Sequence, residues 1–147
     1  MGNWATPETF GTSREELQQR IQASPFNAWL GLLIEAILPD RVEFIVPWKS
    51  EFTGTPQLNR AHGGVLAALA DAAAGYTLMA HTGVSVSTVD LRLDFHQAAS
   101  PGQLRIKGSV VHQGRKLSCA DVQIFDTDDR LVASGRGTFY TPNVESV

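Results

Sequence analysis

Two features of the sequence carry residue types that could do chemistry, and both fall within one apolar run. The run opens with the motif HGG at positions 62–64, and Asp71 is the only formally charged residue between Arg60 and Asp90. A carboxylate among Ala, Gly, Leu and Val neighbours is costly unless something there uses it. Asp71 is therefore the first candidate for a functional group.

The two glycines stand where a helix is expected to begin. A helix N-terminus leaves backbone N–H groups unpaired and carries a partial positive charge, and glycine lets a ligand oxygen approach those groups closely. Gly63 and Gly64 could therefore polarise a carbonyl or hold an oxyanion. Asp71 lies nine residues after His62, about 13 Å along the axis, which is too far for both features to act on one small group. A working site would then need a second chain to supply one of its halves.

Both features also have structural explanations. Asp71 could be a partly buried carboxylate that accepts a hydrogen bond from a backbone N–H. Gly63 and Gly64 could simply form a tight turn from loop to helix. The two features together, in this order and with a lone charge, favour the functional interpretation.

One long helix must position these residues. The apolar run extends from about His62 to Thr82, and Gly83 provides a left-handed stop. Because the helix is apolar nearly all round, it must be buried on most of its circumference. At about 100° per residue, the stripe expected to face a sheet comprises Val65, Leu69, Ala72, Tyr76 and Met79. A second stripe, nearly bare of side chains, comprises Gly64, Ala67, Ala68, Asp71, Ala74, Gly75 and Leu78.

Shorter elements are expected before this helix. A capping box, in which Glu16 follows Ser13 by three residues, starts a short helix whose apolar face is formed by Leu17 and Ile21. Pro25 then opens a further helical turn. The two apolar runs that follow flank a Pro-Asp turn signal, which predicts a hairpin.

The chain after the long helix reads as four antiparallel strands. In the first of them, one face is expected to carry Val89, Leu91, Leu93 and Phe95. Turn signals then recur about every dozen residues, as in a meander. One helix against such a sheet predicts the α+β class. We divide the chain into an N-terminal helical extension, residues 1–24, and a single domain, residues 25–147.

The bulk composition excludes several function classes. With 12 basic and 15 acidic residues, the net charge of −3 argues against non-specific binding of nucleic acid. The single cysteine, Cys119, excludes an internal disulfide and fits a cytoplasmic location. The histidines show no ligand spacing, so no metal site is expected. The apolar run is too short and too rich in Ala for a membrane span, and the loose myristoylation pattern at Gly2 is not expected to be used.

The order of these features resembles the hotdog-fold acyl-CoA thioesterases of the phenylacetate-degradation (PaaI-like) type. HGG is followed seven residues later by Asp71, on a helix that comes after a hairpin and before four strands. The similarity extends from about Phe26 to Tyr140. It includes STVDL after the helix, the GR pair at positions 114–115 and the closing LVASGRGTF.

The resemblance implies a hotdog fold, one long central helix wrapped by an antiparallel β-sheet, here with short N-terminal helices. It also implies a homodimer or a dimer of dimers, that is, a homotetramer. In such proteins the active sites lie at the dimer interface, where the start of one helix faces the acid on the other chain's helix. No cofactor is implied, because the acyl-CoA thioester is itself the substrate.

The resemblance also assigns catalytic roles. Asp71 matches the family's catalytic acid, which acts as a general base on water or as a nucleophile. The N–H of Gly63, with or without that of Gly64, matches the donor that polarises the thioester carbonyl. Thr88 falls where the family often places a Ser or Thr that helps to hold the attacking water.

Other positions match the family less closely. The family's Asn or Gln before the histidine corresponds to Asn59, to Gln57 or to neither. His62 is expected to cap or orient the site. Arg115 and Lys116, in a turn, could contact the phosphates of CoA, or they could be solvated turn charges.

These expectations combine into one hypothesis, hydrolysis of an acyl-CoA to the free acid and CoA. The resemblance alone points to a small aromatic or medium-chain acyl group. One alternative is a non-catalytic sensor that binds acyl-CoA. Another is an acyl-thioester dehydratase or hydratase on the same fold.

Overall fold

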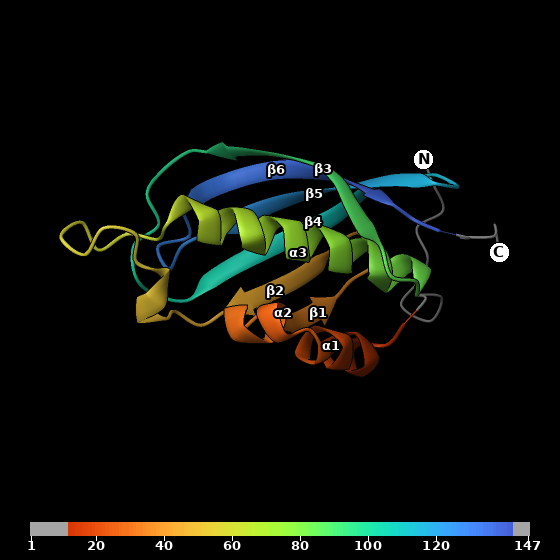
Figure 1. Cartoon of the computed structure of the whole chain (residues 1–147), viewed down its shortest axis with the longest axis horizontal. Coiled ribbons are helices and arrows are strands. Elements are labelled where there is room, and N and C mark those ends of the chain that lie inside the picture. Colours follow the sequence, from red (N-terminus) through yellow and green to blue (C-terminus); the bar gives the residue numbers. More distant parts are fainter. Residues whose placement is uncertain (1–11, 143–147) are drawn as a thin grey trace.

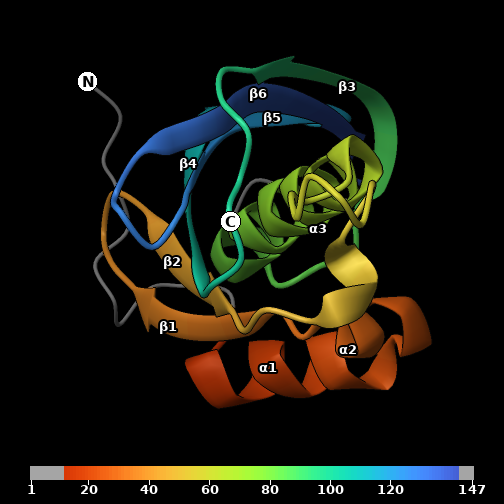
Figure 2. The same cartoon turned by 90° about the vertical axis from the view of Figure 1, so that its left-hand side faces the viewer.

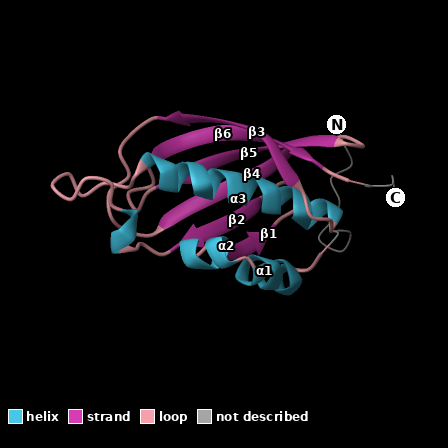
Figure 3. Cartoon of the chain, in the orientation of Figure 1, coloured by secondary structure: helices cyan, strands magenta, loops and turns pink. Residues whose placement is uncertain are grey.

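A six-stranded antiparallel sheet curls around one long helix, α3 (Gly63–Thr82) (Figures 1 and 2). The computed structural model describes residues 12–142, and Gly2 therefore lies outside the described residues. The strands lie in the order β1-β2-β4-β5-β6-β3. Their bounds are Leu33–Ile37 (β1), Val42–Val46 (β2), Ser87–Phe95 (β3), Leu104–Gln113 (β4), Leu117–Phe125 (β5) and Leu131–Tyr140 (β6). The expected α+β architecture is confirmed (Figure 3).

Two short helices precede the sheet, α1 (Arg14–Ala23) and α2 (Pro25–Leu30), and they lie alongside β1 (Figure 2). The Ser13–Glu16 capping box is present at the start of α1. Leu17 and Ile21 are fully buried and belong to the same hydrophobic core as the sheet. The predicted helical face of α1 is therefore confirmed, and it packs against β1 and α3.

The hairpin predicted around the Pro-Asp signal is also present. Strand β1 pairs antiparallel with β2, and backbone hydrogen bonds between Leu38 and Arg41 close the turn. Phe44 of β2 is fully buried. The hairpin thus forms one edge of the sheet, and β3 forms the other.

Helix α3 begins and ends where the sequence predicts. His62 is its N-cap, and Gly83 ends it in the left-handed conformation at φ 75°. The helix is long and apolar enough to cross a membrane by length and composition alone, but here it forms the core helix of the fold. Most of its side chains from Leu66 to Ala80 are buried.

The predicted assignment of helix faces was wrong. Thr77 lies against β4, where a side chain in place of Gly108 would collide with it, and Ala74 lies against Gly137 of β6. Ala72, expected on the sheet side, is only partly buried. Tyr76 accepts a hydrogen bond from Asn27 of α2 at 2.9 Å. A helix that is apolar all round carries no periodic signal to show which face meets the sheet.

The strict alternation predicted for β3 fails at one residue. Thr88 pairs with Phe139 of β6, but Asp90 pairs with Thr138, so Val89 is an extra residue in a β-bulge. Val89 is 59% exposed. Because of the bulge, Thr88 shares the helix-facing side of the strand with Leu91, Leu93 and Phe95, and Val89 does not.

Candidate active site

Asp71 is held by the hydroxyl of Thr88. Thr88 Oγ1 donates a hydrogen bond of 2.6 Å to Asp71 Oδ1, joining α3 to β3 across 17 residues of sequence. The bulge at Val89 makes this contact possible, because it turns Thr88 towards the helix. Asp71 is partly buried and Thr88 is exposed. The partner of Asp71 is therefore a side-chain hydroxyl and not the backbone N–H considered as the structural alternative.

The Asp71 carboxylate keeps capacity for further contacts. Within residues 12–142, the bond from Thr88 is the one hydrogen bond found at this carboxylate. A carboxylate has two oxygens and about four lone-pair positions. Asp71 can thus be oriented by Thr88 and still accept a proton from water or attack an electrophile.

The start of α3 is organised by His62. Its Nδ1 atom accepts a hydrogen bond of 2.8 Å from the N–H of Gly64. The Gly64 N–H is therefore occupied and is not available to a ligand, although the sequence suggested it as a donor. His62 acts as a side-chain cap, and its own N–H donates to Phe52 O at 2.7 Å.

The N–H of Gly63 is different. Among the described residues it has no acceptor, as expected for the first residue of a helix. Gly63 is exposed, and its N–H lies at the positive end of the helix dipole. Gly63 is therefore the one of the two glycines that can donate to a substrate carbonyl.

The structure of this chain does not itself require glycine at position 63. A Cβ added there would make only ordinary contacts of 3.5 Å with Cε1 and Cζ of Phe95. By contrast, a Cβ at Gly64 would lie 2.9 Å from Nδ1 of His62. Neither backbone strain nor packing therefore calls for glycine at position 63.

The two halves of the candidate site lie apart within one chain. Gly63 opens α3 and Asp71 follows eight residues later, which corresponds to about 12 Å along the axis. One thioester carbonyl cannot accept a hydrogen bond from Gly63 and also receive a nucleophile held by Asp71 at that separation. Within a single chain these two groups do not form one site.

Asn59 and Gln57 lie in the loop that projects beyond the start of α3 (Figure 1). Both are exposed, and Asn59 adopts a left-handed backbone conformation with φ 47°. The Asn59 N–H donates to Thr55 O. The loop brings both side chains to the same end of the molecule as His62, which leaves open the choice between them.

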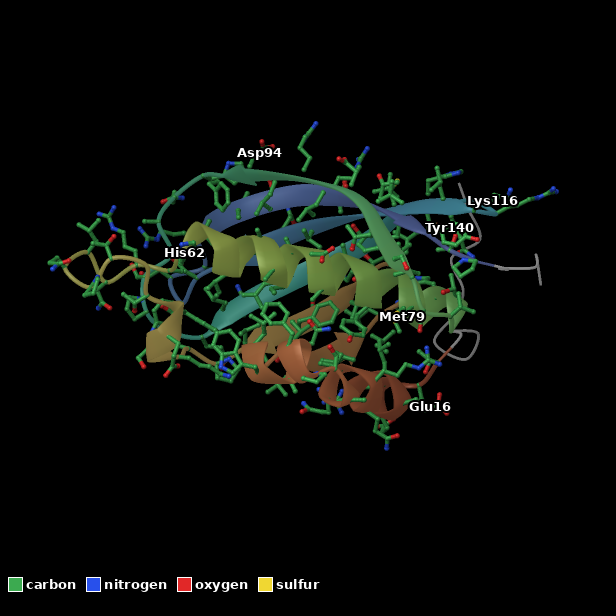
Figure 4. The ribbon with its side chains drawn as sticks, in the orientation of Figure 1. Glu16, His62, Met79, Asp94, Lys116 and Tyr140 are labelled. Atoms are coloured by element: carbon green, nitrogen blue, oxygen red, sulfur yellow. The ribbon has the colours of Figure 1, made fainter. Side chains whose placement is uncertain are left out.

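Arg115 and Lys116 occupy the turn between β4 and β5 and are exposed. This turn lies at the end of the molecule opposite His62 (Figure 4). Within one chain, the structure therefore does not bring Arg115 and Lys116 together with Gly63.

A hollow of about 680 Å³ lies on the face of the sheet that points away from α3. It is lined by charged side chains, including the pair in which Arg136 donates to Asp121 at 2.6 Å. That hydrogen bond raises the pKa of Arg136. Acidic and basic groups are interleaved here, so the hollow has no concentration of charge of one sign that would attract a charged ligand. The hollow also lies on the face of the sheet opposite α3 and therefore does not include Asp71.

The described part of the chain contains no group of three or more His, Cys, Asp or Glu side chains placed to hold a metal ion. Sequence reasoning missed two features of the site, the bulge at Val89 and the position of Phe95. Phe95 shares a face with Leu91 and Leu93, as predicted, yet it is 57% exposed, and its ring lies beside Gly63. No local pattern signals either feature, because both depend on where β3 meets β6 and α3.

The chain is similar in sequence to known thioesterases. A sequence profile of the thioesterase superfamily matches residues 58–133. The chain is 27% identical over 130 residues to the medium/long-chain acyl-CoA thioesterase YigI of Salmonella typhimurium, covering 78% of this chain and 84% of that protein. It is 31% identical to the proofreading thioesterase EntH of Cronobacter sakazakii, covering 73% and 78%.

Solved structures share the fold. A protein from the thioesterase superfamily is 36% identical, with a TM-score of 0.84 over 87% of this chain and 97% of that chain. Thioesterase superfamily member 2 of zebrafish is 26% identical, with a TM-score of 0.78 over 88% and 98%.

Proposed function

The chain belongs to the thioesterase superfamily and is a thioester hydrolase with the hotdog fold, and from this we propose that it hydrolyses acyl-CoA at a site shared by two copies of the chain. The observation that carries the proposal is the pair of half-sites. Asp71 with Thr88 forms one half. The open N–H of Gly63 forms the other.

Both half-sites are attached to the same edge strand, which suggests how they meet. Thr88 stands near one end of β3 and Phe95, whose ring lies beside Gly63, stands at the other. These residues are seven positions apart, about 23 Å along a strand. Within residues 12–142, no strand pairs with the outer edge of β3. Antiparallel pairing of two copies through a two-fold axis near Leu91 would bring the Thr88 end of one strand to the Phe95 end of the other.

In the proposed dimer, Asp71 faces the partner subunit's Gly63. The Gly63 N–H polarises the thioester carbonyl and stabilises the oxyanion that develops on it. Asp71 either takes a proton from the attacking water or attacks the carbonyl itself. In both routes a C–O bond forms and the C–S bond breaks, so that water and acyl-CoA become the free acid and CoA. The thiolate is a good leaving group, so modest activation suffices.

Thr88 has two proposed roles. Its hydroxyl donates a hydrogen bond to Asp71, and this bond fixes the orientation of the carboxylate. The lone pairs of the hydroxyl oxygen remain able to accept a hydrogen bond from the attacking water. Asn59 or Gln57 is proposed as a second donor near the carbonyl. Both lie in the loop at the start of α3.

Arg115 and Lys116 are proposed to bind the phosphates of CoA across the dimer. In the proposed dimer, the two-fold axis places the two chains in opposite directions, so that the opposite ends of the two chains lie side by side. The partner's β4–β5 turn, opposite His62 in one chain (Figure 4), would therefore lie at the end where the first chain's Gly63 holds the carbonyl. Their exposed positive charges suit phosphate binding.

The proposed substrates are acyl-CoAs with a small aromatic or a medium-length acyl group, and no cofactor is needed. The relative from Salmonella typhimurium carries a name that specifies medium and long chains, which supports the second class. We further propose a dimer of dimers in the cytoplasm, the location that the single Cys119 fits.

The test is release of free thiol from a panel of acyl-CoAs by the wild-type protein and by Asp71→Asn. The panel contains phenylacetyl-CoA, hydroxybenzoyl-CoA and straight chains of short and medium length. We expect hydrolysis by the wild type and a loss of about a hundredfold or more in the variant. A wild-type protein that binds acyl-CoA but releases no thiol would instead indicate a sensor.

A further inference from the structure

Phe95 is a large apolar side chain in an unusual position. It pairs with the fully buried Ala133 of β6, so it stands on the core-facing side of the sheet. Leu91 and Leu93, earlier in the same row, are partly buried against the core. Phe95 is nevertheless 57% exposed. The reason is that α3 begins at Gly63, so the helix covers the row only up to that residue.

The ring of Phe95 and the open N–H of Gly63 border the same space. Cε1 and Cζ of the ring lie 3.5 Å from the position that a Cβ on Gly63 would take. A carbonyl oxygen that accepts a hydrogen bond from Gly63 would lie about 2.9 Å from the nitrogen. Because the ring and the N–H both adjoin Gly63, an acyl group held at this N–H would be placed beside the ring.

We propose that Phe95 determines which acyl groups reach the catalytic position, by limiting the space beside the thioester carbonyl. The ring leaves room for a CH₂ group attached to the carbonyl, as in straight-chain and arylacetyl thioesters. It excludes acyl groups in which a ring or a branch is attached directly to the carbonyl, as in benzoyl thioesters. This inference rests on the proposed function, because it assigns a substrate class to the same site.

The ring also has an effect on the donor. An apolar group beside the Gly63 N–H keeps water from that side, and a hydrogen bond in a drier environment is electrostatically stronger. Phe95 therefore supports both selection of the acyl group and polarisation of the carbonyl. The first effect is a discrimination between substrates, which a purely structural role of the ring would not produce.

The experiment measures kcat/KM for three thioesters, hexanoyl-CoA, phenylacetyl-CoA and benzoyl-CoA. Wild type, Phe95→Ala and Phe95→Leu are compared. We expect the wild type to prefer the first two substrates. In Phe95→Ala the ratio of kcat/KM for hexanoyl-CoA or phenylacetyl-CoA to kcat/KM for benzoyl-CoA should fall about tenfold or more. This is the size of effect typical of added space in an apolar pocket. The same ratio in Phe95→Leu should lie between those of the wild type and Phe95→Ala.

The matched control is Phe26→Leu. Phe26 is also an aromatic residue that is 57% exposed, but it lies on α2, beside β1 at the edge of the sheet opposite β3 (Figure 2). Its replacement should leave the preference unchanged. Light scattering on each variant reports the oligomeric state.

Two results would overturn the inference. One is an unchanged preference in both Phe95 variants. The other is an equal loss for all three thioesters together with loss of the dimer, which would make Phe95 an interface residue only. A wild-type protein that hydrolyses none of the thioesters would refute the proposed function itself, and that result is visible before any Phe95 variant is measured.

Discussion

Thr88 Oγ1 donates a hydrogen bond of 2.6 Å to Asp71 Oδ1. This contact joins the middle of the core helix to the edge strand of the sheet, and it depends on the extra residue in the bulge, Val89. β-Bulges often re-aim a side chain next to an active site. The contact therefore gives the lone carboxylate of the helix a fixed orientation towards the open edge.

Removing the Thr88 hydroxyl should lower activity far more than stability. In Thr88→Val the shape and the β-branched character are kept, so the exposed strand should lose about 1 kcal/mol or less. The carboxylate would be free to rotate, and we expect kcat to fall about tenfold to a hundredfold. Thr88→Ser keeps the hydroxyl and should retain most of the activity. Equal activity of Thr88→Val and wild type would refute the positioning role.

Replacing Gly63 with proline should remove the proposed donor and leave the helix intact. Gly63 is the first residue of α3, where proline is well tolerated because its missing N–H is unpaired anyway. His62 has φ −63° and ψ 136°, a conformation that suits a residue before proline. We expect kcat to fall about a hundredfold to a thousandfold, as for loss of an oxyanion donor.

Gly63→Ala is the control for that variant. It keeps the N–H and adds only a methyl group with ordinary contacts to Phe95. A smaller loss than in Gly63→Pro, with far-UV circular dichroism unchanged in both, assigns the effect to the N–H. Equal losses in the two variants would mean that space, and not the donor, matters at this position.

The partly buried His81 should make stability depend on pH. Burial lowers the pKa of His81 below its usual value of 6.5. The unfolded chain therefore binds the proton more readily than the folded protein, and the free energy of unfolding should fall as the pH drops below about 6.5. Urea unfolding at pH 7.5 and pH 5.0 measures the change. In His81→Gln the fall should be smaller than in wild type, and an identical fall in both would contradict this explanation.

Local signals in the sequence were enough to predict the helices and the hairpin that hold the site. The capping box at Ser13 and the stop at Gly83 define their helix ends by nearby residues alone, and both are present. The same holds for the hairpin turn, whose residues hydrogen-bond to one another. Such features depend on interactions within a few positions of the chain, so composition and spacing reveal them.

Long-range geometry explains what the sequence missed. The bulge at Val89 is defined only by pairing with β6, and nothing near Val89 marks it. The face of α3 that meets the sheet is set by where Gly108 and Gly137 allow close approach. The exposure of Phe95 follows from the point where α3 begins.

The central claim is that each active site combines Asp71 of one chain with Gly63 of another. The most direct measurement uses a heterodimer of Asp71→Asn and Gly63→Pro chains, isolated through two different affinity tags. Each variant alone should be nearly inactive. The heterodimer should recover close to half of the wild-type activity per dimer, because two-fold symmetry leaves one of its two sites intact. A heterodimer as inactive as its parents would show that Asp71 and Gly63 do not act together across the two chains.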